Sequence, residues 1–123
     1  MKRILDIEIY KALSDESRLR ILNLLLQTKL CVCEIEVVLD ISQSNASRHL
    51  SKLKNAEIIV SKKEAQWVYH DMNEEFMREN KNLCRHLRKK FNINELFLED
   101  IRKLDALKKK GCSCNEIIRR KKV

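Results

Sequence analysis

The sequence has no proline, and Gly111 is its single glycine among 123 residues. Antiparallel sandwiches and barrels use many glycine- and proline-rich turns between short strands. Their absence argues against an all-β fold. Hydrophobic residues make up 44% of the chain and charged residues 36%, which is typical of a globular protein with a heavily charged exterior.

Long apolar runs are also absent, since no stretch approaches the roughly 20 residues of a membrane-spanning helix. The first residues reach an acidic side chain, Asp6, too early for a secretory signal. We therefore expect a cytoplasmic protein with no membrane partner. The five cysteines are Cys31, Cys33, Cys84, Cys112 and Cys114. We expect them to be mostly thiols in a reducing compartment, and their odd number argues against a disulfide framework.

The charge is positive and unevenly distributed. Twenty-six basic residues against 18 acidic ones give a net charge of +8. Residues 108–123 carry seven basic residues and one acidic residue, and residues 42–63 carry five basic residues and one acidic residue. Such patches attract polyanions, so nucleic acid is a possible partner, although lysine-rich surfaces are also common without one.

The spacing of apolar residues predicts a series of helices interrupted by one hairpin. Helices are expected over residues 4–13, from a Ser14 cap to about residue 26, over 31–40, and from a Ser42 cap to about Ala56. Two β-branched and aromatic runs, 58–60 and 67–69, predict the hairpin, and helices follow from Asn73 to Phe91 and over about 94–108. We predict one domain, residues 1–108, followed by a basic, cysteine-bearing tail, residues 109–123.

A short helix, a tight turn and a serine-capped helix form a helix-turn-helix pattern. A hairpin directly after the second of these helices makes the pattern a winged helix. The predicted fold is therefore mainly α, a winged helix-turn-helix with a short two-stranded β wing and flanking helices.

The helix after Ser42 has a polar face suited to reading DNA. Glutamine and arginine can each form two hydrogen bonds to a base in the major groove, and serine allows close approach to phosphates. No acidic residue occurs from Gln43 to Ala56, whereas an ordinary solvated helix usually carries glutamate among its lysines. The predicted DNA contacts are Ser42, Gln43, Ser44, Ser47, Arg48, His49 and Lys52, with Lys62 and Lys63 of the hairpin on the phosphate backbone.

Cys31 and Cys33 form a C-x-C pair at the start of the third predicted helix. Residues two apart on a regular helix point about 200° away from each other, so both sulfurs reach one ion only if the first turn is irregular. We expect both cysteines near the solvent, with a thiol pKa lowered by the helix N-terminus. Thiolates select soft ions. The alternative is that the two cysteines are small apolar fillers.

Four stretches resemble the ArsR/SmtB family of metal-responsive winged-helix repressors: ALSDESRLRIL (12–22), LCVCEI (30–35), SQSNASRHL (42–50) and WVYH (67–70). The resemblance covers residues 4–107. It implies a homodimer on an imperfect inverted repeat of operator DNA, with the first and last helices at the dimer interface, and a ligand that releases the DNA. Family members have glycines where this chain has Glu57 and Ala65-Gln66, so a turn of positive φ would be strained there.

The resemblance also implies a thiolate site such as that of arsenite and antimonite sensors, or of cadmium and lead sensors. Glu36 occupies the place of a third cysteine found in some relatives. Cys84, Cys112 and Cys114 are the candidate further donors. Cys84 lies on an apolar stripe and is interpreted as structural, which leaves Cys31, Cys33, Cys112 and Cys114 as the predicted ligands. The other family site, for zinc or nickel, is not expected because His86 is the only histidine in the helix that would carry it.

The leading hypothesis is a dimeric repressor released from its operator by As(III) or Sb(III). Arsenic is preferred because the region from Leu83 to the tail resembles arsenical repressors. Four thiolates would equally suit Cd(II) or Pb(II), and a thiol-redox switch is a third alternative. A cysteine-dependent enzyme is not expected, since the chain has neither a C-x-x-C motif nor a glycine-rich anion loop. A protein that only buffers metal ions would not explain why the predicted helix from Gln43 to Ala56 lacks acidic residues.

Overall fold

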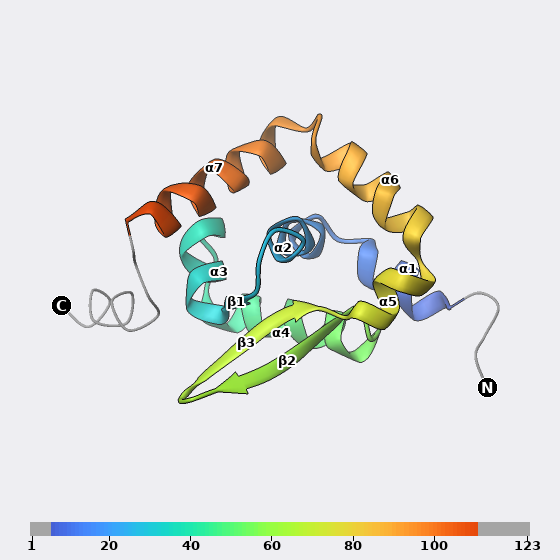
Figure 1. Ribbon diagram of the computed structural model, residues 1–123, viewed down its shortest axis with the longest axis horizontal. Helices are drawn as coiled ribbons and strands as arrows, with labels where there is room; N and C mark the ends of the chain where they lie inside the picture. The colour runs from blue at the N-terminus through green and yellow to red at the C-terminus, as the bar shows by residue number, and fades with distance from the viewer. Residues whose placement is uncertain (1–5, 111–123) are drawn as a thin grey trace.

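The computed structural model describes residues 6–110, and its elements follow the predicted order closely (Figure 1). They are α1 (Ile7–Leu13), α2 (Glu16–Leu25), β1 (Leu30–Cys31), α3 (Val32–Leu39), α4 (Gln43–Asn55), β2 (Ile59–Glu64), β3 (Trp67–Met72), α5 (Glu74–Glu79), α6 (Lys81–Phe91) and α7 (Glu95–Lys109). The predicted mainly helical fold with an antiparallel wing is confirmed.

Side-chain caps fix where the helices begin. Ser42 caps α4 as predicted, because its hydroxyl accepts a hydrogen bond from the Asn45 amide at 3.2 Å. The predicted cap of α2 is wrong by one residue. Asp15 is the cap and accepts from the Arg18 amide at 3.1 Å, whereas Ser14 ends α1.

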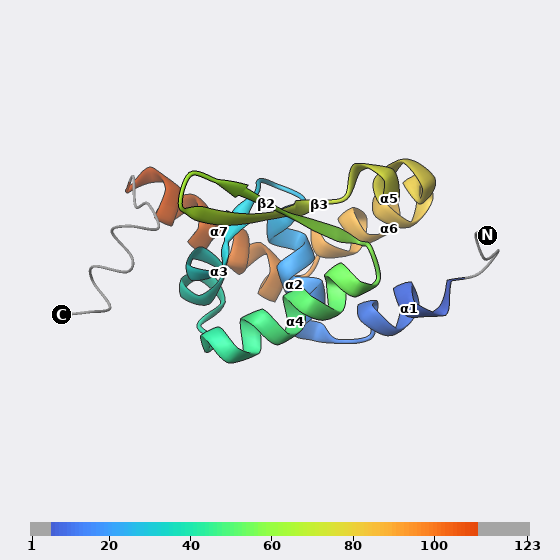
Figure 2. The same ribbon diagram turned by 90° about the horizontal axis from the view of Figure 1, so that it is seen from below.

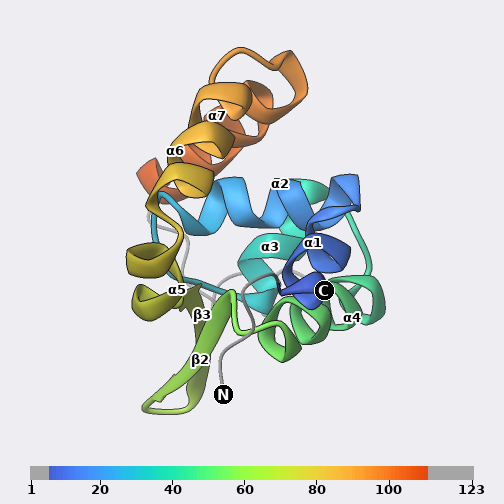
Figure 3. The same cartoon turned by 90° about the vertical axis from the view of Figure 1, so that its right-hand side faces the viewer.

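The core is built around α2, which lies between α7 on one side and α1 and α4 on the other (Figure 3). Four of its apolar residues, Ile21, Leu22, Leu24 and Leu25, are buried, with Ile21 and Leu24 at 0% exposure. Leu53 of α4 and Ile58, which leads into β2, are equally buried. The apolar spacing read from the sequence therefore marks the faces that the helices bury.

The wing belongs to a three-stranded antiparallel sheet in the order β1-β3-β2. β3 pairs with the whole of β2, from Ile59 opposite Met72 to Glu64 opposite Trp67. The third strand, β1, pairs Cys31 with Tyr69 and was not predicted. It has only two residues, too few to produce an alternating pattern. Its consequence is that Cys31 lies at the base of the wing.

Two helices, α5 and α6, replace the single helix predicted between Asn73 and Phe91. The break falls at Asn80, whose backbone is not helical (φ −125°, ψ 43°). The side-chain amide of Asn80 donates to the Phe76 carbonyl at 3.0 Å, which closes α5. The chain then turns, and α6 and α7 form an arc over α2 (Figure 1).

α7 is fastened to α2 by buried polar contacts. Arg20 makes two hydrogen bonds to the carboxylate of Asp100, at 2.7 and 2.8 Å, and Asp100 is completely buried. The side-chain amide of Asn23 donates to the Phe97 carbonyl at 3.0 Å. A bidentate pair of this kind fixes orientation as well as distance. Within residues 6–110, no helix is both long enough and apolar enough to cross a membrane.

Candidate nucleic-acid interface and sulfur pair

One side of α4 packs into the core and the other is open to solvent. Ala46, Leu50 and Leu53 are buried, while the outward face at the edge of the molecule is polar and basic (Figure 2). All but one of the residues predicted on this helix to contact DNA are exposed, namely Ser42, Gln43, Ser44, Ser47, Arg48 and Lys52. The exposed Arg48 guanidinium donates a hydrogen bond to Asn45 Oδ1 at 3.2 Å.

His49 is the exception. Its prediction as a DNA contact is wrong, because its side chain is not on the exposed face of α4. It is buried, with 6% exposure, and its Nδ1 lies 3.3 Å from Nη1 of Arg18 on α2. Burial lowers the pKa of His49, and the charges of Arg48 and Arg18 lower it further against the opposing effect of Asp15. His49 therefore joins α4 to α2 and is not part of the exposed face.

Lys62 and Lys63 are exposed on β2, and the wing and α4 project at the same end of the molecule (Figure 3). The two places where relatives carry glycine both have positive φ, 62° at Glu57 and 55° at Ala65. The expected backbone strain is thus present at both turns, at roughly 1–2 kcal/mol per residue for a side chain in this region. Lys29 supports the wing through its ammonium, 2.6 Å from the Glu64 carboxylate.

The sulfur atoms of Cys31 and Cys33, called here the sulfur pair, lie 3.1 Å apart. Cys33 is a free thiol, whereas Cys31 is disulfide-bonded, so the expected thiol state is wrong for Cys31. Cys31 is the N-cap of α3, with an extended backbone (φ −87°, ψ 164°), and Cys33 lies inside the first turn. The sequence pattern predicts both residues on the helix, and both sulfurs could then face one ion only if the first turn were irregular. No irregular first turn is needed, because Cys31 precedes the helix and its side chain does not follow the helical period.

The sulfur pair is also less accessible than predicted. Cys31 is 3% exposed and Cys33 7% exposed. Burial raises the pKa of the Cys33 thiol, and the charges of Glu34 and Glu36 add to this effect against the backbone amides of Glu34 and Cys33. The expectation of a solvent-facing thiol with a lowered pKa is therefore wrong for Cys33, since desolvation outweighs the helix N-terminus.

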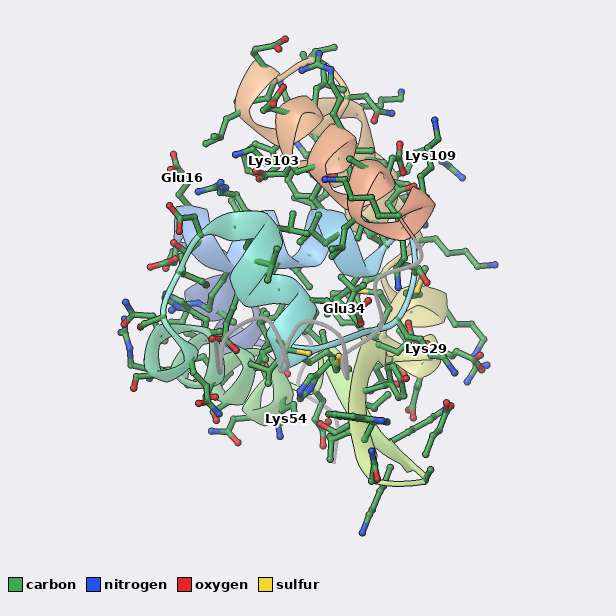
Figure 4. The ribbon with its side chains drawn as sticks, turned by 90° about the vertical axis from the view of Figure 1, so that its left-hand side faces the viewer. Glu16, Lys29, Glu34, Lys54, Lys103 and Lys109 are labelled. Carbon is green, nitrogen blue, oxygen red and sulfur yellow. The ribbon has the colours of Figure 1, made fainter. Side chains whose placement is uncertain are left out.

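Glu34 also belongs to the site, although the sequence pattern did not predict it. It is buried, with 3% exposure, and its Oε1 accepts a hydrogen bond from the Cys31 amide at 3.0 Å. The same oxygen lies 3.2 Å from Cys31 Sγ, and Oε2 lies 2.7 Å from Nζ of Lys108 on α7. Figure 4 shows Glu34 below α7, beside the start of α3. An acid three residues after a helix cap is a signal that could have indicated it.

Cys112 and Cys114 lie outside the described residues. Cys84 is buried on α6, where burial raises its thiol pKa against the charge of Arg88, in agreement with a structural role. His86 is exposed. Over residues 6–110, no group of three or more His, Cys, Asp or Glu side chains could hold a metal ion.

A capped, outward-facing α4 after the short α3, followed directly by a hairpin, defines a winged helix-turn-helix protein. Residues 15–61 match the family described as "Bacterial regulatory protein, arsR family". The arsenical resistance operon repressor of Bacillus subtilis (strain 168) is 37% identical over 84 residues, which cover 66% of this chain and 80% of that protein. The chain belongs to the arsR family of bacterial regulatory proteins.

Two further relatives have different ions in their names, arsenic in one and cadmium in the other. The arsenic resistance transcriptional regulator ArsR1 of Pseudomonas putida is 38% identical over 68 residues, 54% of this chain and 53% of the relative. The cadmium resistance regulator CadC homolog of Staphylococcus aureus is 37% identical over 73 residues, 58% of this chain and 60% of the relative. The chain thus spans between half and two thirds of the length of these two regulators.

Solved structures share the fold. HlyU from Vibrio cholerae N16961 superimposes with a TM-score of 0.56 at 35% sequence identity, covering 64% of this chain and 87% of HlyU.

Proposed function

We propose that this protein is a homodimeric transcriptional repressor that binds operator DNA through α4 and leaves it when a soft ion binds the sulfur pair. The relatives named as arsenical and cadmium resistance regulators support the proposal. The observation that carries it is the outward face of α4, which is exposed, polar and free of acidic residues from Gln43 to Ala56.

The face fits a major groove by size and chemistry. Ser42, Ser44 and Ser47 are short and allow the N-terminal part of α4 to approach the DNA closely. Gln43 and Arg48 carry the side chains that form paired hydrogen bonds with adenine and guanine. Lys52, with Lys62 and Lys63 on the wing, supplies positive charge for the phosphate backbone. Gln43 and Arg48 therefore give sequence preference, and Lys52, Lys62 and Lys63 give affinity.

A homodimer would present two copies of α4 to the two halves of an imperfect inverted repeat. Both ends of the helical series expose apolar side chains that a partner would cover. Ile7 and Tyr10 of α1 are 44% and 51% exposed, and Leu96 of α7 is 39% exposed. We assign the dimer interface to α1 and α7 on these grounds.

The proposed inducer is As(III) or Sb(III). Cys31 is disulfide-bonded and Cys33 is a free thiol. Once a reductant opens the Cys31 disulfide, the two sulfurs, which lie 3.1 Å apart, can both face one ion, and thiolates prefer soft ions over hard ones. A third sulfur would complete a pyramidal site, and we assign it to Cys112 or Cys114 of the tail. Cd(II) or Pb(II), held by all four sulfurs, is the alternative, which the similarity to the cadmium resistance regulator supports.

Replacement of Arg48 by alanine tests the assignment of α4 to DNA. A DNA duplex is first selected from a random pool by the wild-type protein, and its Kd is measured by fluorescence anisotropy. Loss of one paired base contact costs about 1–3 kcal/mol per half-site. We therefore expect Arg48→Ala to weaken binding at least tenfold without changing the dimer in sedimentation.

The matched control is Arg85→Ala, which removes an exposed arginine from α6, away from α4 (Figure 3). Its Kd should stay within threefold of the wild-type value at equal salt concentration. An Arg48→Ala protein that binds the selected duplex as tightly as the wild type would contradict the role of α4.

A further inference from the structure

The most positively charged element that the structure describes is α6, not α4. It carries five basic residues and no acidic residue, and the stretch without acidic residues runs from position 80 to position 94. α4 carries three basic residues and no acidic one. α7 carries four residues of each sign, so a helix on the surface of this protein does not need an excess of one charge. The basic residues of α6, called here the α6 basic face, are Lys81, Arg85, Arg88, Lys89 and Lys90.

The α6 basic face is open to solvent. All five of its residues are exposed, and within residues 6–110 none of them forms an ion pair. Their exposure follows from the helical period, because α6 turns its apolar side towards the protein and buries Cys84 and Phe91. Glu95, the next acidic residue along the chain, is paired with Arg102 of α7 at 3.0 Å. The charge of the face is therefore available to a partner.

Helix physics by itself does not favour this arrangement. Arg85 has a like charge four residues before it, at Lys81, and another four residues after it, at Lys89, and this spacing is destabilising. Lys81 is also the first residue of α6, where the helix macrodipole favours an acidic side chain. A bound polyanion neutralises these charges and removes their repulsion. The α6 basic face is therefore complementary to a negatively charged partner.

The chemistry of the exposed residues decides between kinds of polyanion. α6 exposes Asn82 and His86 beside its cations, and none of its apolar side chains is exposed. Protein interfaces have an apolar and aromatic centre, and helices that lie on a membrane insert an apolar face, whereas the apolar side of α6 is turned into the protein. Phosphate contacts need only positive charge and hydrogen-bond donors. The composition of the face therefore favours a nucleic-acid backbone.

The α6 basic face and α4 lie at opposite ends of the molecule. Figure 3 shows α6 and α7 on one side of α2, with α4 and the wing on the other side. A short duplex bound along α4 and the wing therefore leaves the α6 basic face directed away from it. The two surfaces are placed to contact two separate segments of nucleic acid.

We propose that the α6 basic face is a second DNA-binding surface, which binds the phosphate backbone of a second duplex regardless of its sequence. The 11 residues of α6 span about 16 Å, and a duplex of that length carries about nine phosphate charges. Double-stranded DNA is the favoured polyanion, because a protein held on DNA by α4 meets neighbouring segments at a high effective concentration. The protein then links two segments of DNA, and this linkage rests on the proposed function of α4.

A capture assay with two duplexes tests the inference. Full-length protein is bound to the selected duplex on beads, and free protein is washed away. A fluorescent duplex of scrambled sequence is then added, at several salt concentrations at which the first duplex stays bound. The test variant is Arg85→Gln with Lys89→Gln, which removes two charges four residues apart on the face. The control is Lys103→Gln with Lys109→Gln, which removes two exposed charges from α7 (Figure 4).

We expect the wild type and the α7 control to capture the second duplex, with an affinity that falls as salt rises. Each phosphate contact contributes about 0.9 to the slope of log affinity against log salt concentration. Loss of two contacts should therefore lower this slope by about 1.8 and weaken capture at about 0.1 M salt at least tenfold. Sedimentation should show a dimer for each protein. The Kd for the selected duplex alone should stay within threefold, as for Arg85→Ala, because α4 is unchanged.

A wild-type protein that binds the selected duplex but captures no second duplex overturns the inference and leaves the proposed function intact. Capture that the α6 variant retains at the wild-type level also overturns it. So does stronger competition by polyglutamate or by anionic phospholipid vesicles than by unlabelled duplex, because the face would then prefer an acidic protein or a membrane surface. A wild-type protein that does not bind the selected duplex contradicts the proposed function instead. Direct binding of the scrambled duplex, lost in the α6 variant, would still support the second surface.

Discussion

Asn23, Glu34, His49, His70 and Asp100 are the buried polar residues among those that the structure describes, and each connects two elements. Their contacts join α2 with α7 (Asn23 and Asp100), α3 with α7 (Glu34), α4 with α2 (His49) and β3 with β2 (His70). No fully buried side-chain nitrogen or oxygen of these described residues lacks a hydrogen-bond partner. Because an unpaired buried polar group is costly, such contacts fix how the elements are arranged.

The two buried histidines should make folding stability depend on pH. Burial lowers the pKa of His70, with a contribution from the charge of Lys54, and burial likewise lowers the pKa of His49. The unfolded chain has ordinary histidine pKa values of about 6.5. As pH falls through 6.5, the unfolded state therefore binds protons that the folded state does not. Stability decreases until the lowered folded pKa values are passed.

Urea unfolding between pH 7.5 and pH 5.0, at one protein concentration, measures this effect. The free energy of unfolding of the wild type should fall across the range, and the double variant His49→Gln, His70→Gln should show a smaller slope. His86→Gln, which changes the exposed histidine, should keep the wild-type slope. Equal slopes in the double variant and the wild type would contradict the assignment of the pH dependence to His49 and His70.

At the scale of the elements, the wing carries a turn that its sequence does not suit. Ala65 has φ 55°, a region that glycine occupies without strain and alanine does not. Replacement by glycine removes this strain, of about 1–2 kcal/mol, and adds about 0.5–1 kcal/mol of backbone entropy cost. Ala65→Gly should therefore stabilise the protein by up to about 1.5 kcal/mol.

The matched control is Ala106→Gly, which changes an exposed alanine inside α7. Glycine in a helix interior should destabilise the protein by about 1 kcal/mol. Opposite signs for the two alanine-to-glycine changes in urea unfolding would support the strained wing turn. A less stable Ala65→Gly protein would show that the turn tolerates alanine without strain.

The sequence predicts the elements better than it predicts the site. Apolar spacing and the Ser42 cap indicate α4 with correct bounds, because both signals are local. The two-residue β1 and the break at Asn80 lack a periodic signal. Glu34 and Lys108 are 74 positions apart, and each reads as a surface charge until the fold brings them together. The burial of His49 could not be predicted from the sequence either, because its neighbour Arg48 on the same helix is exposed.

At the scale of the whole molecule, α4 and the wing lie at one end and α6 and α7 at the other, with α2 between them (Figures 1 and 3). The sulfur pair lies where the sheet, α3 and the end of α7 meet. The proposed DNA face and α7, one of the two proposed dimer helices, are thus on different sides of the core. Through Glu34, the sulfur pair is connected to the end of α7.

The most direct test of the account is a single anisotropy titration of the protein bound to its selected duplex. Each protein is first treated with a phosphine reductant, which opens the Cys31 disulfide. Sodium arsenite is then added to the wild type, to Cys33→Ser and to Cys84→Ser. Cys84→Ser is the control, because Cys84 is a buried cysteine outside the pair. The account predicts release of the duplex from the wild type and Cys84→Ser, and retention by Cys33→Ser with unchanged initial affinity. Release of the duplex from Cys33→Ser, at the arsenite concentration that releases it from the wild type, would contradict the proposed role of the sulfur pair.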